Sequence, residues 1–451
     1  MRRSIALLIA GVTAVAMLAA IPARAAAPPK TFDRQLTFDP HYAEGEPSIA
    51  VNPTNPANII VTFLADTFLG VPGAYYGQAP TARDAQQPIQ GCDYVVSFDA
   101  GKTWARHTLP ITNFDADPTR TNCSDTIVTF DQHGTAYVMG GAYNFPAFVA
   151  GLGDFRIISS RDGGRTWSSP SVISPTIGSP GADPAKWQGV RFYDDRPFMT
   201  VDDSTGTIYV DGTQGRIEAN GPQGDTEYFT ASTDGGKTWT DAIAVGMASP
   251  SPLGAAFGTV AFTNPAPSGA TRSCSCLDLV VSTDGAHSYV RRPTPIPGTS
   301  GLDGASTAAD PTTAGHFAVL TTDSAGNAAI YRTPDAGLTW SGPTTVGVPG
   351  TTIDQPWLAY SPNGVLGAGW KAKSSDNSYA YYAAVSDDGG TTFASPVRIS
   401  SAPSPPPEPF VPAGDDTTSI VLTGNRLYAA WADWRGGNNL QIWWGGFPVH
   451  R

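Results

Sequence analysis

One octet recurs six times along the 451-residue sequence, and it constrains the fold more than any other feature. Its clearest copy is Ser-Thr-Asp-Gly-Gly-Lys-Thr-Trp at positions 232–239, and the others begin at Ser97, Ser160, Ser282, Thr333 and Ser386. Successive central aspartates are 63, 72, 50, 51 and 53 residues apart. A repeat of this length indicates an array of similar supersecondary units, which bury a core by stacking on one another.

Each octet has the composition of a β-hairpin corner. Alternating apolar residues precede it, as in Tyr94-Val95-Val96, and indicate a strand. The Asp carboxylate can accept hydrogen bonds from backbone N–H groups further along the turn, and the following Gly allows a positive φ. The Thr and the aromatic residue then begin the returning strand. We therefore expect a structural role for the six aspartates, Asp99, Asp162, Asp234, Asp284, Asp335 and Asp388.

The octet resembles the Asp-box, also called the BNR repeat, of the sialidase superfamily. The first three copies match the pattern S-x-D-x-G-x-T-W at every defined position. Thr333 replaces Ser in the fifth copy and Phe393 replaces Trp in the sixth, while the fourth has Ala286 and Ser288-Tyr289. The resemblance covers nearly the whole mature chain and implies a β-propeller.

We expect an all-β fold, a single β-propeller whose blades are four-stranded antiparallel sheets. Frequent Gly (49) and Pro (40) and a low content of charged residues suit many short strands and tight turns. Six units end in an octet. Three more strands follow the last octet without one of their own: Thr418–Leu422, Arg426–Trp431 and Leu440–Trp444.

The fourth strand of this last blade can come from the other end of the chain. Pairing of Thr31–Phe38 with Leu440–Trp444 would close the ring and remove open sheet edges. This gives seven blades, closed by an N-terminal strand. Six blades is the alternative, which holds if the unit at about Leu253–Pro295, whose first two strands are weak, is not a blade.

Residues 1–25 have the pattern of a secretory signal peptide: Arg2-Arg3, an apolar run at 5–21, and Ala-Arg-Ala at 23–25. We therefore expect a secreted protein, extracellular or periplasmic, whose residues 26–451 form one propeller domain. Since no second long apolar run follows in the sequence, we expect no membrane span.

Charge limits the partners that this chain can have. Loss of Arg2, Arg3 and Arg24 with the signal peptide changes the formal net charge from −12 to −15. Such an acidic chain is poorly suited to bind nucleic acid or an anionic membrane. We expect a monomer whose partner is an extracellular glycan or glycoconjugate.

The four cysteines fit an exported protein. Cys92 and Cys123 should lie near the junction of the first two blades, and we expect a disulfide between them. Cys274 and Cys276 are so close in sequence that they are either bridged or reduced. Two thiols make half a zinc site, and the nearest histidine, His287, lies in an octet, so we expect no metal and no cofactor.

Candidate site residues follow from strand order. The octets and the turns between first and second strands should share one face, and the long loops, such as 65–91, the other. Residues just before the innermost strands should ring the channel on that second face. They are Glu46-Pro47, Asp125, Asp195-Arg196-Pro197-Phe198, Asp354-Gln355-Pro356-Trp357 and Asp415-Asp416, joined by Asp433-Trp434-Arg435 from the last blade.

Convergent carboxylates and arginines suit an acidic sugar. Asp195, Asp354 and Asp433 are candidate acid or base groups for a glycosidic bond. Arg196 and Arg435 could bind a sugar carboxylate, with Glu46, Asp125, Trp357 and Trp434 as further contacts. The alternative for each acid is a turn cap or an ion pair with a neighbouring blade, and for each Trp it is core packing.

The resemblance to sialidases implies three arginines on the sialate carboxylate, a Tyr nucleophile with a Glu partner, and an Asp acid/base. The F-R-I-P-like motif of that family is absent from the first unit, and the nearest string is Asp195-Arg196-Pro197-Phe198. Arg196 and Arg435 could supply two of the three arginines. The Tyr, its Glu and the third Arg are not assigned.

Three functions are therefore compared: hydrolysis of an acidic sugar glycoside, non-catalytic binding of glycans or proteins, and polysaccharide lysis. A lyase needs a neutralised uronate and a Tyr or His base, for which His41, near Glu44 and Glu46, is the candidate. The sequence has no G-x-S-x-G, H-E-x-x-H or P-loop motif.

Overall fold

We analysed a computed structural model of the chain. The structure describes residues 29–38, 43–66, 90–111, 122–143, 153–173, 191–218, 221–247, 249–267, 269–270, 274–298, 305–406, 417–436 and 440–449. The expected signal peptide, His41, most of the loop 65–91 and Asp415-Asp416 lie outside these residues. Among the described residues, no helix has the length and hydrophobicity needed to cross a bilayer.

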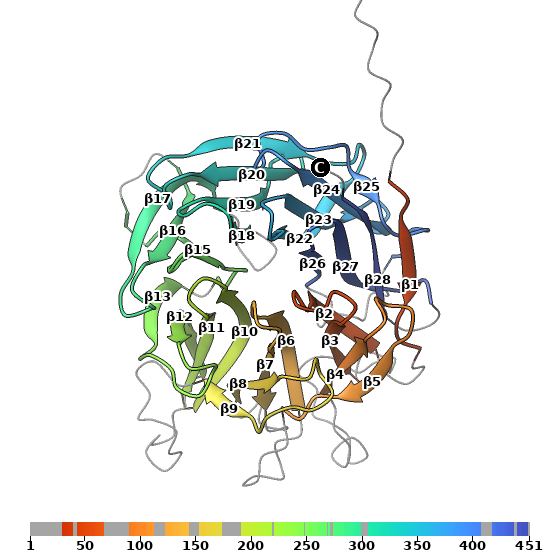
Figure 1. Cartoon of the computed structure of the whole chain (residues 1–451). Helices are drawn as coiled ribbons and strands as arrows, with labels where there is room; N and C mark the ends of the chain where they lie inside the picture. The colour runs from red at the N-terminus through yellow and green to blue at the C-terminus, as the bar shows by residue number, and fades with distance from the viewer. Residues whose placement is uncertain are drawn as a thin grey trace, which may run out of the picture.

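Seven four-stranded antiparallel sheets surround a central channel, so the seven-bladed β-propeller predicted from the sequence is confirmed (Figure 1). Blade one contains β2 (Ala43–Val51), β3 (Ile59–Asp66), β4 (Gln90–Ser97) and β5 (Ala105–Thr108). Blade two contains β6 (Asn122–Phe130), β7 (Ala136–Tyr143), β8 (Gly153–Ser160) and β9 (Ser171–Ile173). Blade three contains β10 (Arg191–Asp202), β11 (Thr207–Glu218), β12 (Gly221–Ser232) and β13 (Ile243–Met247).

The remaining blades follow the same order from the channel outward. Blade four contains β14 (Gly254–Ala256), β15 (Thr259–Pro265), β16 (Cys276–Ser282) and β17 (Val290–Pro297). Blade five contains β18 (Ala305–Ala309), β19 (Phe317–Thr322), β20 (Ala328–Thr333) and β21 (Ser341–Val346). Blade six contains β22 (Thr352–Tyr360), β23 (Leu366–Lys373), β24 (Tyr379–Ser386) and β25 (Val397–Arg398). Blade seven contains β26 (Ser419–Leu422), β27 (Arg426–Asp433), β28 (Gln441–Pro448) and β1 (Phe32–Gln35).

Blade four is a true blade, so the six-blade alternative is wrong. Its inner strand β14 has three residues, which explains the weak signal in the sequence. All three pairs, from Gly254↔Ala261 to Ala256↔Thr259, are nevertheless formed with β15. A Cβ at Gly254 would lie 2.4 Å from the backbone N of Ala309, so only Gly lets β14 approach blade five this closely.

The N-terminal strand closes the ring as predicted. Four residues of β1 pair antiparallel with β28, from Phe32↔Gly446 to Gln35↔Trp443. A Cβ at Gly446 would lie 2.1 Å from the carbonyl oxygen of Leu427 in the next strand. The paired strand is shorter than the Thr31–Phe38 segment expected from the sequence.

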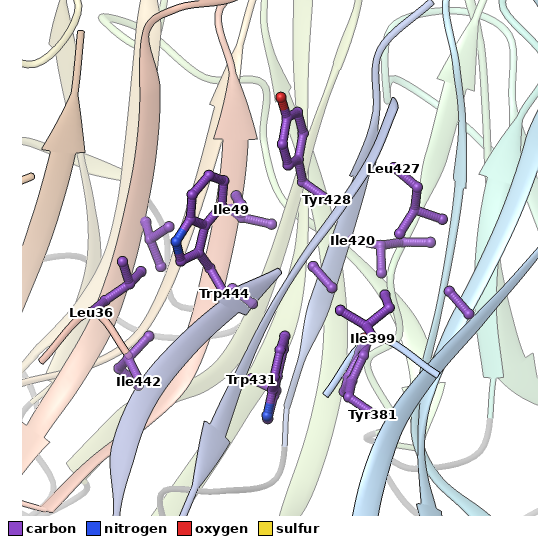
Figure 2. Packing of buried hydrophobic residues seen from close by; sticks show 14 of the residues in the cluster. Leu36, Ile49, Tyr381, Ile399, Ile420, Leu427, Tyr428, Trp431, Ile442 and Trp444 are labelled. Carbon is purple, nitrogen blue, oxygen red and sulfur yellow. The ribbon is translucent and has the colours of Figure 1, made fainter. Parts of the chain in front are cut away.

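A hydrophobic cluster joins blades six and seven to the closing strand (Figure 2). The rings of Tyr381 and Trp431 are stacked with centroids 4.9 Å apart, and those of Tyr428 and Trp444 with centroids 5.5 Å apart. Leu36, just after β1, is buried in the same cluster. Side chains on both faces of blade seven are therefore covered by a neighbouring blade, as propeller stacking requires.

Serine hydroxyls also join neighbouring inner strands near the channel. Each accepts a hydrogen bond from a backbone N–H of the next blade, at 2.9–3.1 Å. The pairs are Ser419 with Ile49, Ser48 with Val128, and Ser306 with Leu358. These bonds fix the register of one inner strand against the next, because a side chain of one blade satisfies the backbone of another.

The octets form the predicted turns. In the copy at 232–239, Asp234 Oδ1 accepts from the backbone N–H groups of Lys237 (3.0 Å) and Thr238 (2.9 Å), and Oδ2 accepts from Thr238 Oγ1 (2.6 Å). Ser232 Oγ accepts from Gly236 N–H at 2.9 Å. The bonds from the Thr238 hydroxyl and N–H hold the pKa of Asp234 at about 2.

The fourth octet forms the same turn despite its altered sequence. Ala286 stands where the pattern has Gly and adopts a left-handed φ of 65°. Ser288 Oγ donates to Asp284 Oδ2 at 2.6 Å, so Ser replaces the usual Thr as hydroxyl donor. Ala100 and Ala336 adopt positive φ in their octets too, which shows that the hydrogen bonds to the Asp offset the strain of a Cβ there.

A buried ion-pair network joins the closing strand to blade seven. Arg435 Nη1 lies 2.9 Å from Asp33 Oδ2 of β1, and its Nε lies 2.8 Å from Asp433 Oδ2 at the end of β27. The guanidinium carbon lies 4.0 Å from the ring centroid of Trp443. Asp33 also accepts from the backbone N–H of Ser401, at 2.9 Å. Arg435 thus links three parts of the chain at the site of ring closure.

The Cys92–Cys123 disulfide expected from the sequence is present and links β4 of blade one to β6 of blade two. Its Cα atoms are 5.5 Å apart. Cys274 and Cys276 are also bridged, which settles the alternative that the sequence left open in favour of the disulfide.

We predict that Asp234→Ala lowers the free energy of unfolding by about 1–2 kcal/mol, because several turn donors lose their acceptor. Thermal and denaturant unfolding will measure this. Asp241→Ala, which removes an exposed carboxylate two residues beyond the octet, is the matched control and should change stability little. Equal effects of the two substitutions would contradict a structural role for Asp234.

We predict that Arg435→Ala lowers the free energy of unfolding by about 3–5 kcal/mol, because it leaves Asp33 and Asp433 buried without their cation. Arg426→Ala, which removes an exposed arginine at the start of β27 in the same blade, should cost less than about 0.5 kcal/mol. A variant of Arg435 that is as stable as the Arg426 variant would show that the network does not hold the ring closed.

Candidate functional site

Four inner strands carry a β-bulge at the same level of the channel. The pairing register shifts between Gly45 and Ser48, Ser124 and Ile127, Asp195 and Phe198, and Asp354 and Trp357. One residue in each bulge has a left-handed φ of 49–55°, and these residues are Glu46, Asp125, Arg196 and Gln355. None of them is Gly, so each bulge stores backbone strain.

These bulges correct one detail of the sequence interpretation. The candidate residues were expected just before the inner strands, whereas they lie within β2, β6, β10 and β22. The strand continues on both sides of each bulge and pairs with the next strand of its blade. The extra residue changes the direction of the side chain, which the alternation along a strand would not reveal.

Three of the four bulges meet at one hollow in the channel. Glu46 of blade one, Asp125 of blade two and Arg196 of blade three line it, together with Thr126, Ile127, Pro197, Phe198 and Thr417. Its volume is about 10 Å³, enough for one water-sized group. A second hollow beside it is lined by Gln355 of the fourth bulge, Phe198, Pro252, Pro356, Trp357, Thr417 and Thr418.

The charged groups around the first hollow differ in exposure. Glu46 is buried, Asp125 is half-buried, and the Arg196 side chain is 45% exposed. Ser124 Oγ donates to Asp125 Oδ2 at 2.5 Å. Arg196 Nε lies 3.9 Å from Asp195 Oδ2. Two carboxylates and a cation that remains open to solvent therefore face one small space.

An aromatic pair spans the channel below these hollows. Phe198 of blade three and Trp357 of blade six come from opposite sides of the ring, and their ring centroids are 6.1 Å apart (Figure 1). Both residues line the second hollow, and both also line a larger cavity on the side toward the octets. The pair therefore contributes to the walls of both spaces.

The larger cavity has a volume of about 510 Å³ and is lined by residues of all seven inner strands. Its lining consists mainly of aliphatic and hydroxyl side chains, such as Ile49, Thr200 and Val421. Among the described lining residues, Asp203 is the only charged one. Among the described residues, the carboxylates and the arginine of the candidate site therefore line the hollow on the bulge side.

The other predicted site residues are placed as follows. Asp354 precedes the bulge residue Gln355, and its Oδ2 lies 4.0 Å from Lys373 Nζ. Arg435 binds both Asp433 and Asp33 in the closure network. Trp434 is buried, and its backbone N–H donates to Ser404 Oγ at 3.0 Å. In the part of the chain that the structure describes, neither hollow is lined by Asp433, Trp434 or Arg435, so the expected convergence of Arg435 with Arg196 is not seen.

Gln355, which the sequence placed in the channel ring without a role, lines the second hollow, whereas Thr417 and Thr418 were missed as lining residues. The position of Gln355 follows a recurring dipeptide, because Glu46-Pro47, Arg196-Pro197 and Gln355-Pro356 stand at the same place in three units. The two threonines have no such signal. They follow a stretch without a repeat, and their contact with the other blades depends on the tertiary fold.

Buried acids lie one layer behind the bulges. Asp211 and Glu227 are fully buried on β11 and β12. Glu227 Oε2 accepts from Asn264 Nδ2 at 2.7 Å and from Ser249 N–H at 3.0 Å. Burial raises the pKa of Glu227 to about 8, and burial together with the neighbouring Glu227 raises the pKa of Asp211 well above its usual range.

A third acid lies on the other side of blade three. Asp194 is buried and its Oδ1 accepts from Gln214 Nε2 at 3.0 Å. Burial raises its pKa to about 7. No group of three or more His, Cys, Asp or Glu side chains able to hold a metal ion occurs within the described ranges.

No protein-family model and no curated protein matches the sequence. Solved structures do match. A protein of unknown function from Dyadobacter fermentans DSM 18053 is 14% identical, with a TM-score of 0.50 over 93% of this chain and 98% of that one. The Hadza microbial sialidase Hz136 is 15% identical with a TM-score of 0.47, over 90% of this chain and 66% of that one. The polysaccharide lyase Uly1 is 9% identical with a TM-score of 0.48, over 78% and 77%. At these identities the similarity concerns the propeller fold alone.

We predict that Glu227→Gln flattens the pH dependence of stability. The unfolded chain releases this proton near the ordinary pKa of 4.5, whereas the folded protein keeps it up to about 8. Folding thus takes up a proton, so this stabilisation is complete below about pH 4.5 and is lost as the pH rises toward 8. Gln keeps the bond to Ser249 N–H without a titrating proton.

Denaturant unfolding from pH 4.5 to 8.5 tests this. The wild type should lose more stability than the Glu227 variant over that window, and the exposed control Asp241→Asn should follow the wild type. Asp211 interacts with Glu227, so the two carboxyl groups titrate together. Arg291, which donates to Asn264 Oδ1 at 3.0 Å, stabilises the charged form of Glu227. Parallel curves for all three proteins would contradict the prediction.

Proposed function

We propose that this chain is a secreted propeller that acts on extracellular glycans and hydrolyses a glycosidic bond of an acidic sugar at the bulge side of its channel. One observation carries the proposal: Glu46, Asp125 and Arg196, each on a strained bulge of a different blade, line one hollow. Strained non-glycine residues persist where the surrounding structure enforces them, and they cluster at functional sites.

The chemistry of the three groups suits this reaction. Arg196 is open to solvent and can bind a sugar carboxylate with two parallel N–H···O bonds. Of the carboxyl groups of Glu46 and Asp125, one can protonate the leaving oxygen and the other can assist attack at the anomeric carbon. Asp195, at 3.9 Å from Arg196 Nε, orients the guanidinium. Trp357 offers an aromatic surface below the sugar.

The other candidate residues receive different roles. Asp354 flanks the fourth bulge and contributes charge to the same side of the channel. Asp433 and Arg435 act in ring closure, because their bonds are made to each other and to the N-terminal strand. Trp434 is assigned to packing since it is buried.

Secretion is proposed from residues 1–25 and agrees with two disulfides, which persist in oxidising compartments. We propose a monomer.

We predict that the purified protein turns over one class of fluorogenic acidic glycoside when sialosides, uronides and neutral glycosides are compared. For that substrate, Arg196→Ala should lower kcat/KM by an amount equivalent to about 1.5–3 kcal/mol, the scale of a hydrogen bond to a charged group. Arg196→Lys should recover part of the loss, because it keeps the charge but not the paired donors. Arg426→Ala is the control and should leave turnover unchanged.

Glu46→Gln and Asp125→Asn separate binding from chemistry. Each should lower kcat far more than it changes KM, with folding verified by thermal unfolding. Binding of an acidic glycan without turnover would instead support the non-catalytic alternative. An unsaturated uronate product would support a lyase. Turnover that is insensitive to all three substitutions would place the reaction elsewhere in the molecule.

A further inference from the structure

The two disulfides differ in their exposure. Cys92 and Cys123 are both buried between blades one and two. In the second disulfide Cys276 is buried at the start of β16, whereas Cys274 is exposed on the surface of blade four. An external thiol can therefore approach one disulfide of the folded protein and not the other.

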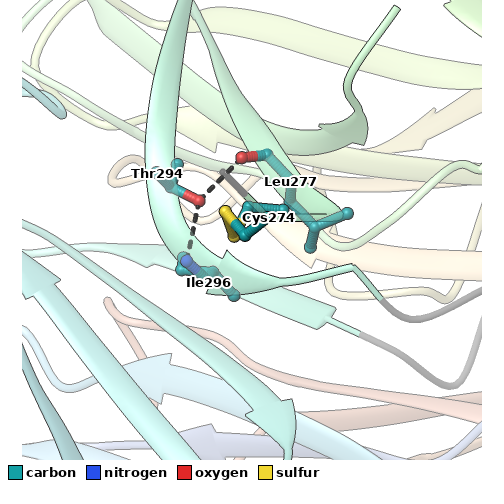
Figure 3. Close-up of a disulfide and its surroundings, with 5 residues drawn as sticks. Cys274, Leu277, Thr294 and Ile296 are labelled. Atoms are coloured by element: carbon teal, nitrogen blue, oxygen red, sulfur yellow. Dashed lines mark hydrogen bonds between the residues drawn. A yellow bond between two sulfur atoms is a disulfide. The ribbon is translucent and has the colours of Figure 1, made fainter. Parts of the chain in front are cut away.

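The exposed disulfide lies where β16 and β17 stop pairing regularly (Figure 3). The register shifts between Cys276 and Asp278, so that Thr294 to Ile296 bulge opposite Leu277. Thr294 Oγ1 donates to the Leu277 carbonyl at 2.7 Å and accepts from Ile296 N–H at 3.1 Å. The bulge is thus held by its own side chain.

The disulfide loop extends the strand pairing by one bond. Ser275, between the two cysteines, accepts a hydrogen bond from Gly298 N–H at 2.6 Å. A Cβ at Gly298 would lie 2.8 Å from the same Ser275 oxygen, so the two backbones are in close contact. This short loop and the Cys276↔Pro297 pair form the end of the β16–β17 ladder.

We propose that Cys274–Cys276 is a thiol-exchange site, which a thiol reductant opens in the folded protein while Cys92–Cys123 stays closed. A thiolate attacks the exposed Cys274 Sγ, the Cys274–Cys276 S–S bond breaks, and a mixed disulfide forms on Cys274. The electron pair of the broken bond leaves as the Cys276 thiolate. A second equivalent of thiol then reduces the mixed disulfide, and the reductant is oxidised to its own disulfide.

Opening has a local effect because an independent network holds blade four next to the loop. Asp278, two residues beyond Cys276, is fully buried and its Oδ2 lies 3.0 Å from Arg291 Nε. Arg291 also donates to the Val245 carbonyl of blade three at 2.8 Å and to Asn264 Oδ1 at 3.0 Å. Reduction therefore loosens Ser275, Cys276 and residues 294–298 and leaves the contact between blades three and four in place.

The test uses glutathione on the native wild-type protein, with N-ethylmaleimide added at intervals to trap thiols. Peptide mass spectrometry should find glutathione on Cys274 and maleimide on Cys276 in the same molecule. Labelling of this pair should be at least ten times faster than labelling of Cys92 or Cys123. Equal rates for the two disulfides, reaction only after denaturation, or glutathione mainly on Cys276 would each overturn the proposal.

Hydrogen exchange tests the local effect. The reduced wild type and the double variant Cys274→Ser/Cys276→Ser should both show faster amide exchange at 275–277 and at Thr294, Ile296 and Gly298, with exchange in β14 and β15 unchanged. Faster exchange throughout blade four would overturn the local character of the opening. The measurement on reduced wild type stands by itself if the double variant fails to fold.

Discussion

Pairing between the two ends of the chain is the interaction on which the rest of the structure depends. A propeller blade buries both faces only when it has a neighbour on each side, so an open ring would expose two blade faces and two sheet edges. Four residue pairs between β1 and β28, with Asp33 bound to Arg435, prevent this. The closure joins residues about 400 positions apart, so it raises the contact order of the fold, and such non-local pairing is intrinsically slow to form.

A closed ring also explains how strained residues persist at the channel. Each inner strand is fixed between two blades, and serine hydroxyls bind the backbone of the next strand. Left-handed backbone at Glu46, Asp125 and Arg196 would relax in an isolated hairpin, but here the neighbouring blades prevent it. The stability of the scaffold and the geometry of the candidate site therefore have the same origin.

The sequence allowed the fold to be predicted in detail because the octet reports a local structure, a turn stabilised within eight residues. Glu46, Asp125 and Arg196 could be placed at the same level of the channel, since position along the inner strand decides it, but their meeting at one hollow was not foreseen. The bond of Arg435 to Asp33 could not be predicted, because the two residues are 402 positions apart and no local signal links them. The bulges were missed because one extra residue alters side-chain direction without changing the apolar pattern.

The aromatic contact between Phe198 and Trp357 couples two spaces of the channel. The two rings come from blades three and six, and both of them line the second hollow as well as the larger cavity. A change in the size of either ring would therefore alter both spaces at once. Residues at one level of the channel can in this way influence the shape of another level without any movement of the blades.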